Sequence, residues 1–308
     1  MEKLIKIGTR GSKLALWQAY HVEQLLKESG FETNIIIIET KGDKILDRSL
    51  AKVGSKGIFT EELETQLLEG KIDIAVHSAK DMPSDLGEYF KIIAFTEREQ
   101  VNDVIVAEDK QLLKREKIIL GTSSVRRTAL LKRFMPQVEI VNMRGNLQTR
   151  IRKMKEGQCN GLVLAFAGVH RMGYNNMIVE HLPPDTFIPP VGQGSIAIES
   201  AITLNPEVGN EIAKAVGHAN TTFCLQAERA FLKTLQGGCS IPAFAHAMLN
   251  MQDQITIKGG IISTDGKELI SFEETVKKNE SKAGGKLLAE KVLAHGGREI
   301  LAELKAES

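Results

Sequence analysis

A single cysteine, Cys239, lies in the segment 235–242, which reads Leu-Gln-Gly-Gly-Cys-Ser-Ile-Pro. The preceding residues predict a helix from Thr221 or Thr222 to about Gln236. The two glycines should end this helix, because glycine adopts the left-handed conformation at low cost. A thiol on such a loop can act as a nucleophile or carry a covalent group. A buried, unreactive thiol is the more common role of an isolated cysteine, so this loop alone leaves both roles open.

Polar and basic residues follow the predicted strands at the positions where the strands end. In open α/β sheets, ligands bind outside the carboxyl ends of the strands, so these positions are candidates for binding. The loop 121–124 opens a predicted helix, and its backbone amides and hydroxyls suit an anion. The candidate binding residues are Arg10, Ser12, Lys80, Thr122, Ser123, Ser124, Arg126, Arg127, Arg144, Arg150 and Arg171.

The arginines in this set suggest the charge of the ligand. Arg126 and Arg127 are expected in the first turn of a helix, where a cation opposes the helix macrodipole and an anionic ligand would relieve the repulsion. Arginine binds carboxylates in bidentate geometry and stays charged at any working pH. Repeated arginines at strand ends therefore suggest a ligand with several carboxylates. The alternative, a solvated surface charge, is retained for Arg152, Lys153 and Lys155.

Two further residues could take part in chemistry. Asp81 follows a predicted strand next to Lys80 and is a candidate acid or base, although a loop carboxylate that caps backbone amides fits the spacing slightly better. Phe59 could stack on an aromatic ligand, although core packing is the usual role of a phenylalanine. His77 is expected only to complete the strand before Asp81.

The elements that position these residues follow two patterns. The first ~200 residues alternate strand and helix signals, which is typical of an α/β fold, and a second unit begins near Val101. Ser12, Thr60 and Asn146 are predicted helix caps, and residues 161–167 form a predicted central strand. The last ~90 residues predict two strands around Asp265-Gly266 and then helix, which indicates a small α+β domain.

Composition excludes several classes of protein. The formal net charge of +1 over 308 residues argues against a general polyanion binder. No apolar run approaches the ~20 residues that a membrane-spanning helix needs, and no signal peptide is predicted at the N-terminus. The three cysteines include no Cys-x-x-Cys pair, which favours a reducing cytosol and predicts no metal site.

Taken together, the motifs resemble the porphobilinogen deaminase (hydroxymethylbilane synthase) family, and they occur in the family's order over nearly the whole chain. They are Gly8-Thr-Arg-Gly-Ser-Lys-Leu-Ala15, Thr40-Lys-Gly-Asp43, Ala51-Lys-Val-Gly-Ser-Lys-Gly57, Ala75-Val-His-Ser-Ala-Lys-Asp81, Gly121-Thr-Ser-Ser-Val-Arg-Arg127, Arg144-Gly-Asn146, Val191-Gly-Gln-Gly194 and Gly237-Gly-Cys239.

The resemblance implies an enzyme, a transferase that joins four porphobilinogens head to tail with release of ammonia and then frees hydroxymethylbilane by hydrolysis. It implies a dipyrromethane cofactor held on Cys239 by a thioether, with Asp81 as the catalytic carboxylate and Phe59 as a ring contact. The residues that match positions binding cofactor or substrate are Arg10, Ser12, Lys80, Thr122, Ser123, Ser124, Arg126, Arg127, Arg144, Arg150, Arg171 and Gln193.

The implied fold has two periplasmic-binding-protein-like (type II) α/β domains with a crossover, plus a C-terminal α+β domain that carries the cysteine loop. The expected domains are residues 1–98 with 195–214, residues 99–194, and residues 215–308. A cytoplasmic monomer with no nucleic-acid or membrane partner is expected. The chain departs from the usual family pattern at Gln100, Val101 and Asn102, which bears on the hinge between the first two domains.

Two other functions remain open at this point. A non-catalytic anion-binding protein of the periplasmic-binding type could use the same arginines, although the Gly-Gly-Cys loop and the lack of a predicted signal peptide count against it. A nucleic-acid-binding protein is disfavoured by the +1 charge and an aromatic content of only 5%.

Overall fold

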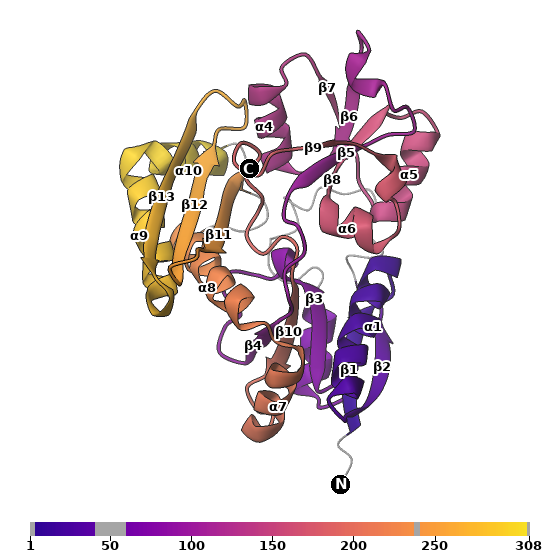
Figure 1. Ribbon diagram of the computed structural model, residues 1–308, viewed down its shortest axis with the longest axis vertical. Coiled ribbons are helices and arrows are strands. Elements are labelled where there is room, and N and C mark those ends of the chain that lie inside the picture. Colours follow the sequence, from indigo (N-terminus) through magenta and orange to yellow (C-terminus); the bar gives the residue numbers. More distant parts are fainter. Residues whose placement is uncertain (1–3, 41–59, 237–240, 307–308) are drawn as a thin grey trace.

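The computed structural model describes residues 4–40, 60–236 and 241–306. The described chain forms two five-stranded sheets and one three-stranded sheet, each with helices packed against it (Figure 1). None of the helices in these ranges is long and apolar enough to cross a membrane.

The first sheet has the strand order β2-β1-β3-β10-β4. Four strands run in the same direction, and β10 lies antiparallel between β3 and β4. A core of aliphatic residues such as Ile7, Ile74 and Ile198 lies between this sheet and its helices. The strands are β1 (Leu4–Arg10), β2 (Glu32–Ile38), β3 (Ile74–Ser78), β4 (Phe90–Phe95) and β10 (Ile196–Ala201), and the helices are α1 (Lys13–Glu28), α3 (Glu61–Leu68) and α7 (Pro206–Val216).

The second sheet repeats this arrangement in the order β7-β6-β8-β5-β9, with β5 antiparallel to both of its neighbours. In each sheet the antiparallel inner strand follows a crossover between the two units. Strand β5 opens the second unit, and strand β10 returns the chain to the first sheet. The strands are β5 (Asp103–Val106), β6 (Ile119–Thr122), β7 (Glu139–Asn142), β8 (Gly161–Ala165) and β9 (Ile178–His181), and the helices are α4 (Val125–Phe134), α5 (Leu147–Lys155) and α6 (Phe166–Arg171).

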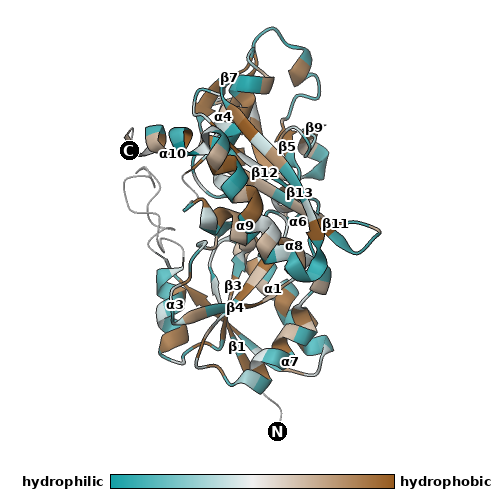
Figure 2. Cartoon of the chain, turned by 90° about the vertical axis from the view of Figure 1, so that its left-hand side faces the viewer, coloured by the Kyte–Doolittle hydropathy of each residue, from teal (hydrophilic) through white to brown (hydrophobic). Residues whose placement is uncertain are grey.

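The C-terminal part is an antiparallel meander covered by helices on one face (Figure 2). Phe231 and Leu288 from the helices pack with Ile257 from the central strand. Gly266 has a positive φ in the turn between β12 and β13, as its sequence predicts. The elements are α8 (Ala219–Thr234), β11 (Ala243–Leu249), β12 (Gln254–Ile262), β13 (Leu269–Lys277), α9 (Ser281–Val292) and α10 (Arg298–Ala306).

The predicted fold class is therefore confirmed, with local differences. Ser12 and Asn146 cap their helices, accepting hydrogen bonds from the Ala15 and Thr149 amides, whereas Thr60 makes no capping bond through its side chain. The predicted strand 161–167 ends at Ala165 and the chain continues as α6. Strands β4, β5, β9 and β11 and helix α7 were not predicted from the sequence.

Candidate active site

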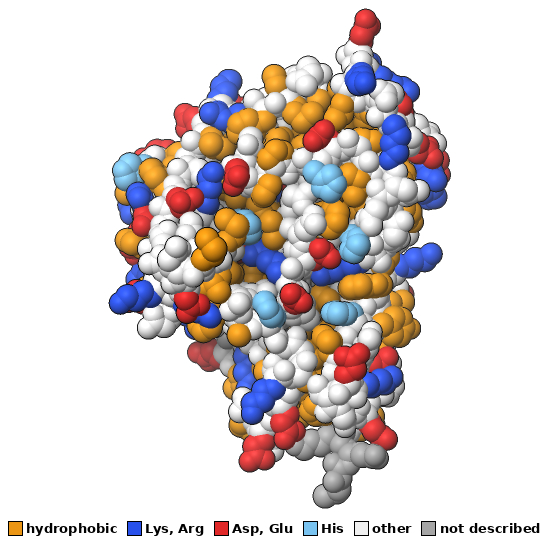
Figure 3. All heavy atoms as spheres, viewed as in Figure 1, with side chains coloured by type: hydrophobic (Ala, Val, Ile, Leu, Met, Phe, Trp, Pro, Cys, Tyr) orange, Lys and Arg blue, Asp and Glu red, His pale blue; other side chains and the backbone are white. Residues whose placement is uncertain are grey.

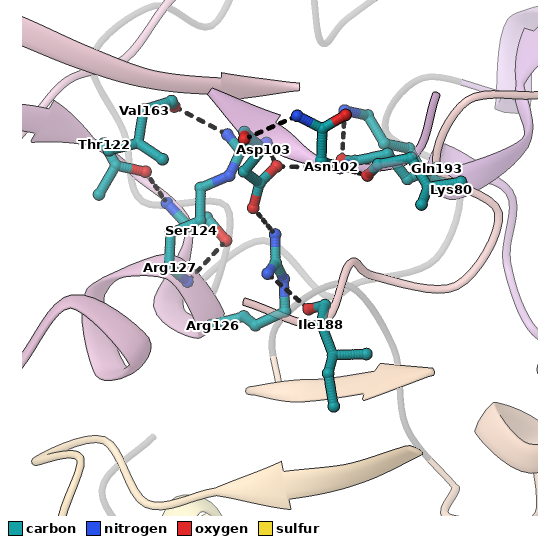
Figure 4. Close-up of polar contacts among 11 residues, drawn as sticks. Lys80, Asn102, Asp103, Thr122, Ser124, Arg126, Arg127, Val163, Ile188 and Gln193 are labelled. Carbon is teal, nitrogen blue, oxygen red and sulfur yellow. Dashed lines mark hydrogen bonds and ion pairs between the residues drawn. The ribbon is translucent and has the colours of Figure 1, made fainter. Parts of the chain in front are cut away.

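A buried carboxylate, Asp103, lies at the centre of the cluster that most of the predicted binding residues form. It opens β5, and its two oxygens accept from different arginines: Arg126 Nη2 donates to Oδ2 at 2.6 Å and Arg127 Nη2 to Oδ1 at 2.8 Å (Figure 4). Gln193 Nε2 donates to Oδ1 at 2.9 Å. All four side chains are buried, so the ion pairs are shielded from solvent.

The loop between β6 and α4 sets the direction of the two arginines. Ser124 caps α4 by accepting from the Arg127 amide at 3.4 Å, and Thr122 Oγ1 accepts from the Ser124 amide at 3.3 Å. The guanidinium groups also donate to the carbonyls of Ile188 and Val163. Positive charge at this helix start is thus balanced partly by Asp103, in addition to any anionic ligand.

The two arginines keep some capacity for a further anion. Among the described residues, neither buried Nε–H has a hydrogen-bond partner. One carboxylate also serves two guanidinium groups, so the pair carries excess positive charge. Ser123 lies half-buried in the same loop.

A hydrogen-bonded chain connects this cluster to the first sheet. Lys80, two residues past the end of β3 at Ser78, donates from Nζ to Gln193 Oε1 at 3.5 Å (Figure 4). Gln193 is fully buried in the returning crossover segment and donates in turn to Asp103 and to the Val101 carbonyl. Lys80 and Asp103 are therefore positioned by one shared glutamine.

Desolvation lowers the pKa of Lys80 and of Arg150. Burial and the charge of Arg127 lower the pKa of Lys80 to about 8, against the opposing effect of Asp81. Burial and Arg127 likewise lower the pKa of Arg150 to about 10. Burial acts to raise the pKa of Asp103, but the charges of Arg126 and Arg127 outweigh it and hold that pKa below its usual range. An added anion would be stabilised here.

Asp81 lies at the exposed edge of the cluster, at the end of a short turn that follows β3. Its charge acts on both Lys80 and Arg150, which places the three groups near one another. Arg150 lies on α5 and donates to the Gly145 carbonyl at 2.7 Å. The charge of Arg144 also acts to lower the pKa of Arg150. Basic side chains gather in a hollow near the middle of the face in Figure 3.

The other predicted binding residues come from other elements of the fold. Arg10 ends β1, and Ser12 caps α1. Arg171 donates to the Gly194 carbonyl at 2.7 Å and lies over the Trp17 ring at 5.2 Å. A water-sized cavity of about 30 Å³ is lined by both Arg171 and Lys80. Phe59 and Cys239 lie outside the described residues.

Sequence reasoning missed the two carboxylates that organise these contacts, Asp103 and Glu228. Asp103 lies in the segment 97–103 that was noted only for its departures from a family pattern. Glu228 lies on α8 and is fully buried. It pairs with Arg98, which lies in the segment 97–103. The sequence signal for both carboxylates is a charged residue at a position where the strand or helix pattern predicts a buried apolar side chain.

Comparison with known proteins shows the family of this chain. The family model for the dipyromethane cofactor binding domain of porphobilinogen deaminase matches residues 5–204, and the model for the C-terminal domain of that enzyme matches residues 222–294. The chain belongs to the porphobilinogen deaminase family. Porphobilinogen deaminases of Cytophaga hutchinsonii and Desulfosudis oleivorans are 53% and 51% identical to it, over 99% and 98% of this chain and 98% of each relative.

Membership of the porphobilinogen deaminase family confirms the predicted transferase class and the predicted dipyrromethane cofactor. It favours the enzyme over the anion-binding alternative. Among solved structures, the methionine binding protein MetQ is 13% identical, with a TM-score of 0.43 over 73% of this chain and 91% of that one. A periplasmic VFT2 domain of Bordetella pertussis BvgS is 17% identical, with a TM-score of 0.43 over 69% and 86%.

Proposed function

We propose that this chain condenses four porphobilinogens head to tail on a dipyrromethane attached to Cys239, releasing ammonia at each step and then hydroxymethylbilane by hydrolysis. The observation that carries this proposal is a cation-rich cluster with one exposed carboxylate, Asp81, at its edge. Porphobilinogen carries an acetate and a propionate, so each added ring brings two anions to be bound. The family assignment supports the reaction.

The side chains of the cluster fit the dipyrromethane. When bound, this group supplies the pyrrole carbon to which the first substrate becomes joined. The unpartnered Nε–H groups of Arg126 and Arg127 and the excess positive charge favour its carboxylates. We assign its binding to Lys80, Thr122, Ser123, Ser124, Arg126, Arg127, Arg144, Arg150 and Gln193, and we keep Arg10, Ser12, Phe59 and Arg171 as contacts for substrate or cofactor.

Asp81 is proposed as the catalytic carboxylate. Positive charge develops on the pyrrole as ammonia leaves, and a fixed anion nearby stabilises that charge. The same carboxylate can accept the proton that the coupled ring loses. Asp81 is exposed, so substrate can reach it from solvent. Lys80 and Arg150, whose charges interact with Asp81, would bind the carboxylates of the same substrate.

The test compares two aspartates four positions apart. Asp81→Asn keeps the shape and removes the charge, and the rate of hydroxymethylbilane formation should fall by roughly two orders of magnitude or more. Asp81→Glu should retain more activity. Asp85→Asn is the matched control, since Asp85 accepts from the Gly87 amide and pairs with the exposed Lys233. Asp81→Asn turnover within about threefold of the parent would limit Asp81 to capping the loop.

We also propose the domain division 1–98 with 195–214, 99–194 and 215–308. The return of β10 to the first sheet supports the first boundary pair, and the start of β5 at Asp103 supports the second unit. A monomer in the cytoplasm, with no nucleic-acid partner, completes the proposal. Light scattering of the purified protein tests the monomer, and a salt-dependent binding assay with DNA and RNA tests the last point.

A further inference from the structure

A cavity of about 440 Å³ lies away from the cluster around Asp103, between the edge strand β4 and helix α8. Cavities of this size bind small organic ligands in many proteins. Strand β4 belongs to the first sheet, whereas helix α8 packs against the C-terminal sheet. The two elements also contact each other, with α8 beside β4 (Figure 1). No other described strand pairs with the outer edge of β4, which is the last strand of its sheet.

The lining of this cavity combines apolar and basic side chains with the polar Ser84, Thr222 and Gln226. Ile92 and Phe95 of β4 and Ala230 of α8 supply apolar surface. Arg229 and Lys233 of α8 and Lys282 of α9 are the basic lining residues. Arg229 and Lys233 are four residues apart, so they share one face of the helix.

The charge around the cavity is unbalanced. None of its described lining residues is acidic. One carboxylate outside the lining, Asp85, pairs with Lys233 at 3.4 Å, with both side chains largely exposed. Arg229 donates to the Pro83 carbonyl at 2.7 Å, which fixes its direction, and burial lowers its pKa. The charges of Glu199 and Asp85 both act on Arg229, so an added anion would be attracted by three cations against two competing carboxylates.

We propose that this cavity binds a small amphipathic carboxylate, with its apolar body against β4 and its carboxylate toward Arg229, Lys233 and Lys282. The side chains of Ile92 and Phe95 favour an apolar body because they offer no hydrogen bonds. The charged side chains among the described lining residues are all basic, which favours a carboxylate. This site is separate from the residues assigned to catalysis, so it does not rest on the proposed function.

The test uses the purified holoenzyme and the fluorescent anion anilinonaphthalene sulfonate, displaced by decanoate or by acetate. Lys282→Glu should weaken binding of the probe roughly three- to tenfold, the range expected for reversing an exposed charge. The matched control is Lys286→Glu, one turn further along α9, where the parent lysine is exposed and pairs with Glu290. This control should bind the probe like the parent.

A third variant should act in the opposite direction. Asp85→Asn keeps the oxygen that accepts from the Gly87 amide but removes one competing charge, so the probe should bind more tightly. Decanoate should displace the probe at concentrations where acetate does not. Equal binding in Lys282→Glu and Lys286→Glu, weaker or unchanged binding in Asp85→Asn, or displacement by acetate as readily as by decanoate would each overturn the proposal.

Discussion

Arg98 and Glu228 form a bidentate ion pair, with Nη1–Oε1 and Nη2–Oε2 distances of 2.5 and 3.1 Å. The same carboxylate accepts from the amides of Gly192 and Ala247, each at 2.8 Å. Arg98 also donates from Nε to the Gln193 carbonyl at 2.8 Å. This pair therefore connects both crossover segments to α8 and β11, and it holds Gln193 where Lys80 and Asp103 meet it.

Replacing Glu228→Gln should destabilise the protein by about 3 kcal/mol, because it leaves Arg98 nearly buried without its counter-charge. The midpoint of urea unfolding measures this change. Glu290→Gln removes an exposed partner of Lys286 and should shift the free energy of unfolding by less than about 0.5 kcal/mol. Equal midpoints for the two variants would show that the Arg98–Glu228 pair does not hold the crossovers.

Replacing Asp103→Asn should cost about 3–5 kcal/mol, because two buried arginines lose their shared carboxylate. The pKa of Asp103 is lowered in the folded state, so its contribution to stability is complete above the unfolded pKa. The parent's advantage over Asp103→Asn should hold above about pH 5 and shrink as the pH falls below about 4. An advantage that grows with acid would contradict this assignment.

Lys80 should set the alkaline limit of cofactor uptake. In the protein without the dipyrromethane the pKa of Lys80 is about 8, so its charge is present below that pH and lost above it. The rate at which the cofactor-free protein takes up the dipyrromethane should therefore decline as the pH rises through about 8. Lys80→Arg should remove this decline, because arginine stays charged. The same decline in both proteins would assign it to another group.

Two neighbouring arginines on α5 distinguish a binding role from a surface charge. Arg150 is half-buried near Asp81, whereas Arg152 is exposed and pairs with Glu156. Arg150→Gln should lower kcat/KM about tenfold or more, the effect of losing one charge-assisted hydrogen bond. Arg152→Gln should leave it near the parent value. Similar values for the two variants would show that Arg150 binds no carboxylate.

The fold was largely predictable, and the exceptions have physical reasons. Ser12 and Asn146 capped as expected because capping depends on local spacing alone. Residues 161–167 are continuously apolar, and such a run does not separate a buried strand from a buried helix, so α6 was missed. Strand β5 was missed because it is short and opens on a charged residue.

The cations of the site and the exposed Asp81 were predictable from the sequence, but the buried carboxylates were not. Arginines at strand ends stand out because the carboxyl ends of parallel strands meet at one edge of a sheet. Asp103 and Glu228 are favourable inside the protein only through partners distant in the sequence, Arg127 and Arg98 among them. No local pattern shows such pairs.

The attachment of the dipyrromethane to Cys239 is the central proposal. The properties of the other two cysteines explain why Cys239 alone should carry it. Cys159 and Cys224 are buried, and burial raises the pKa of both thiols, to about 11 for Cys224. Neither is a reactive thiolate near neutral pH. Cys239→Ser replaces the thiol by a much weaker nucleophile and should yield a protein of bare polypeptide mass.

Peptide mapping by mass spectrometry of the active enzyme tests this claim most directly. We predict a dipyrromethane on the peptide that contains Cys239 and unmodified peptides for Cys159 and Cys224. An enzyme that forms hydroxymethylbilane while Cys239 carries no added mass would contradict the account.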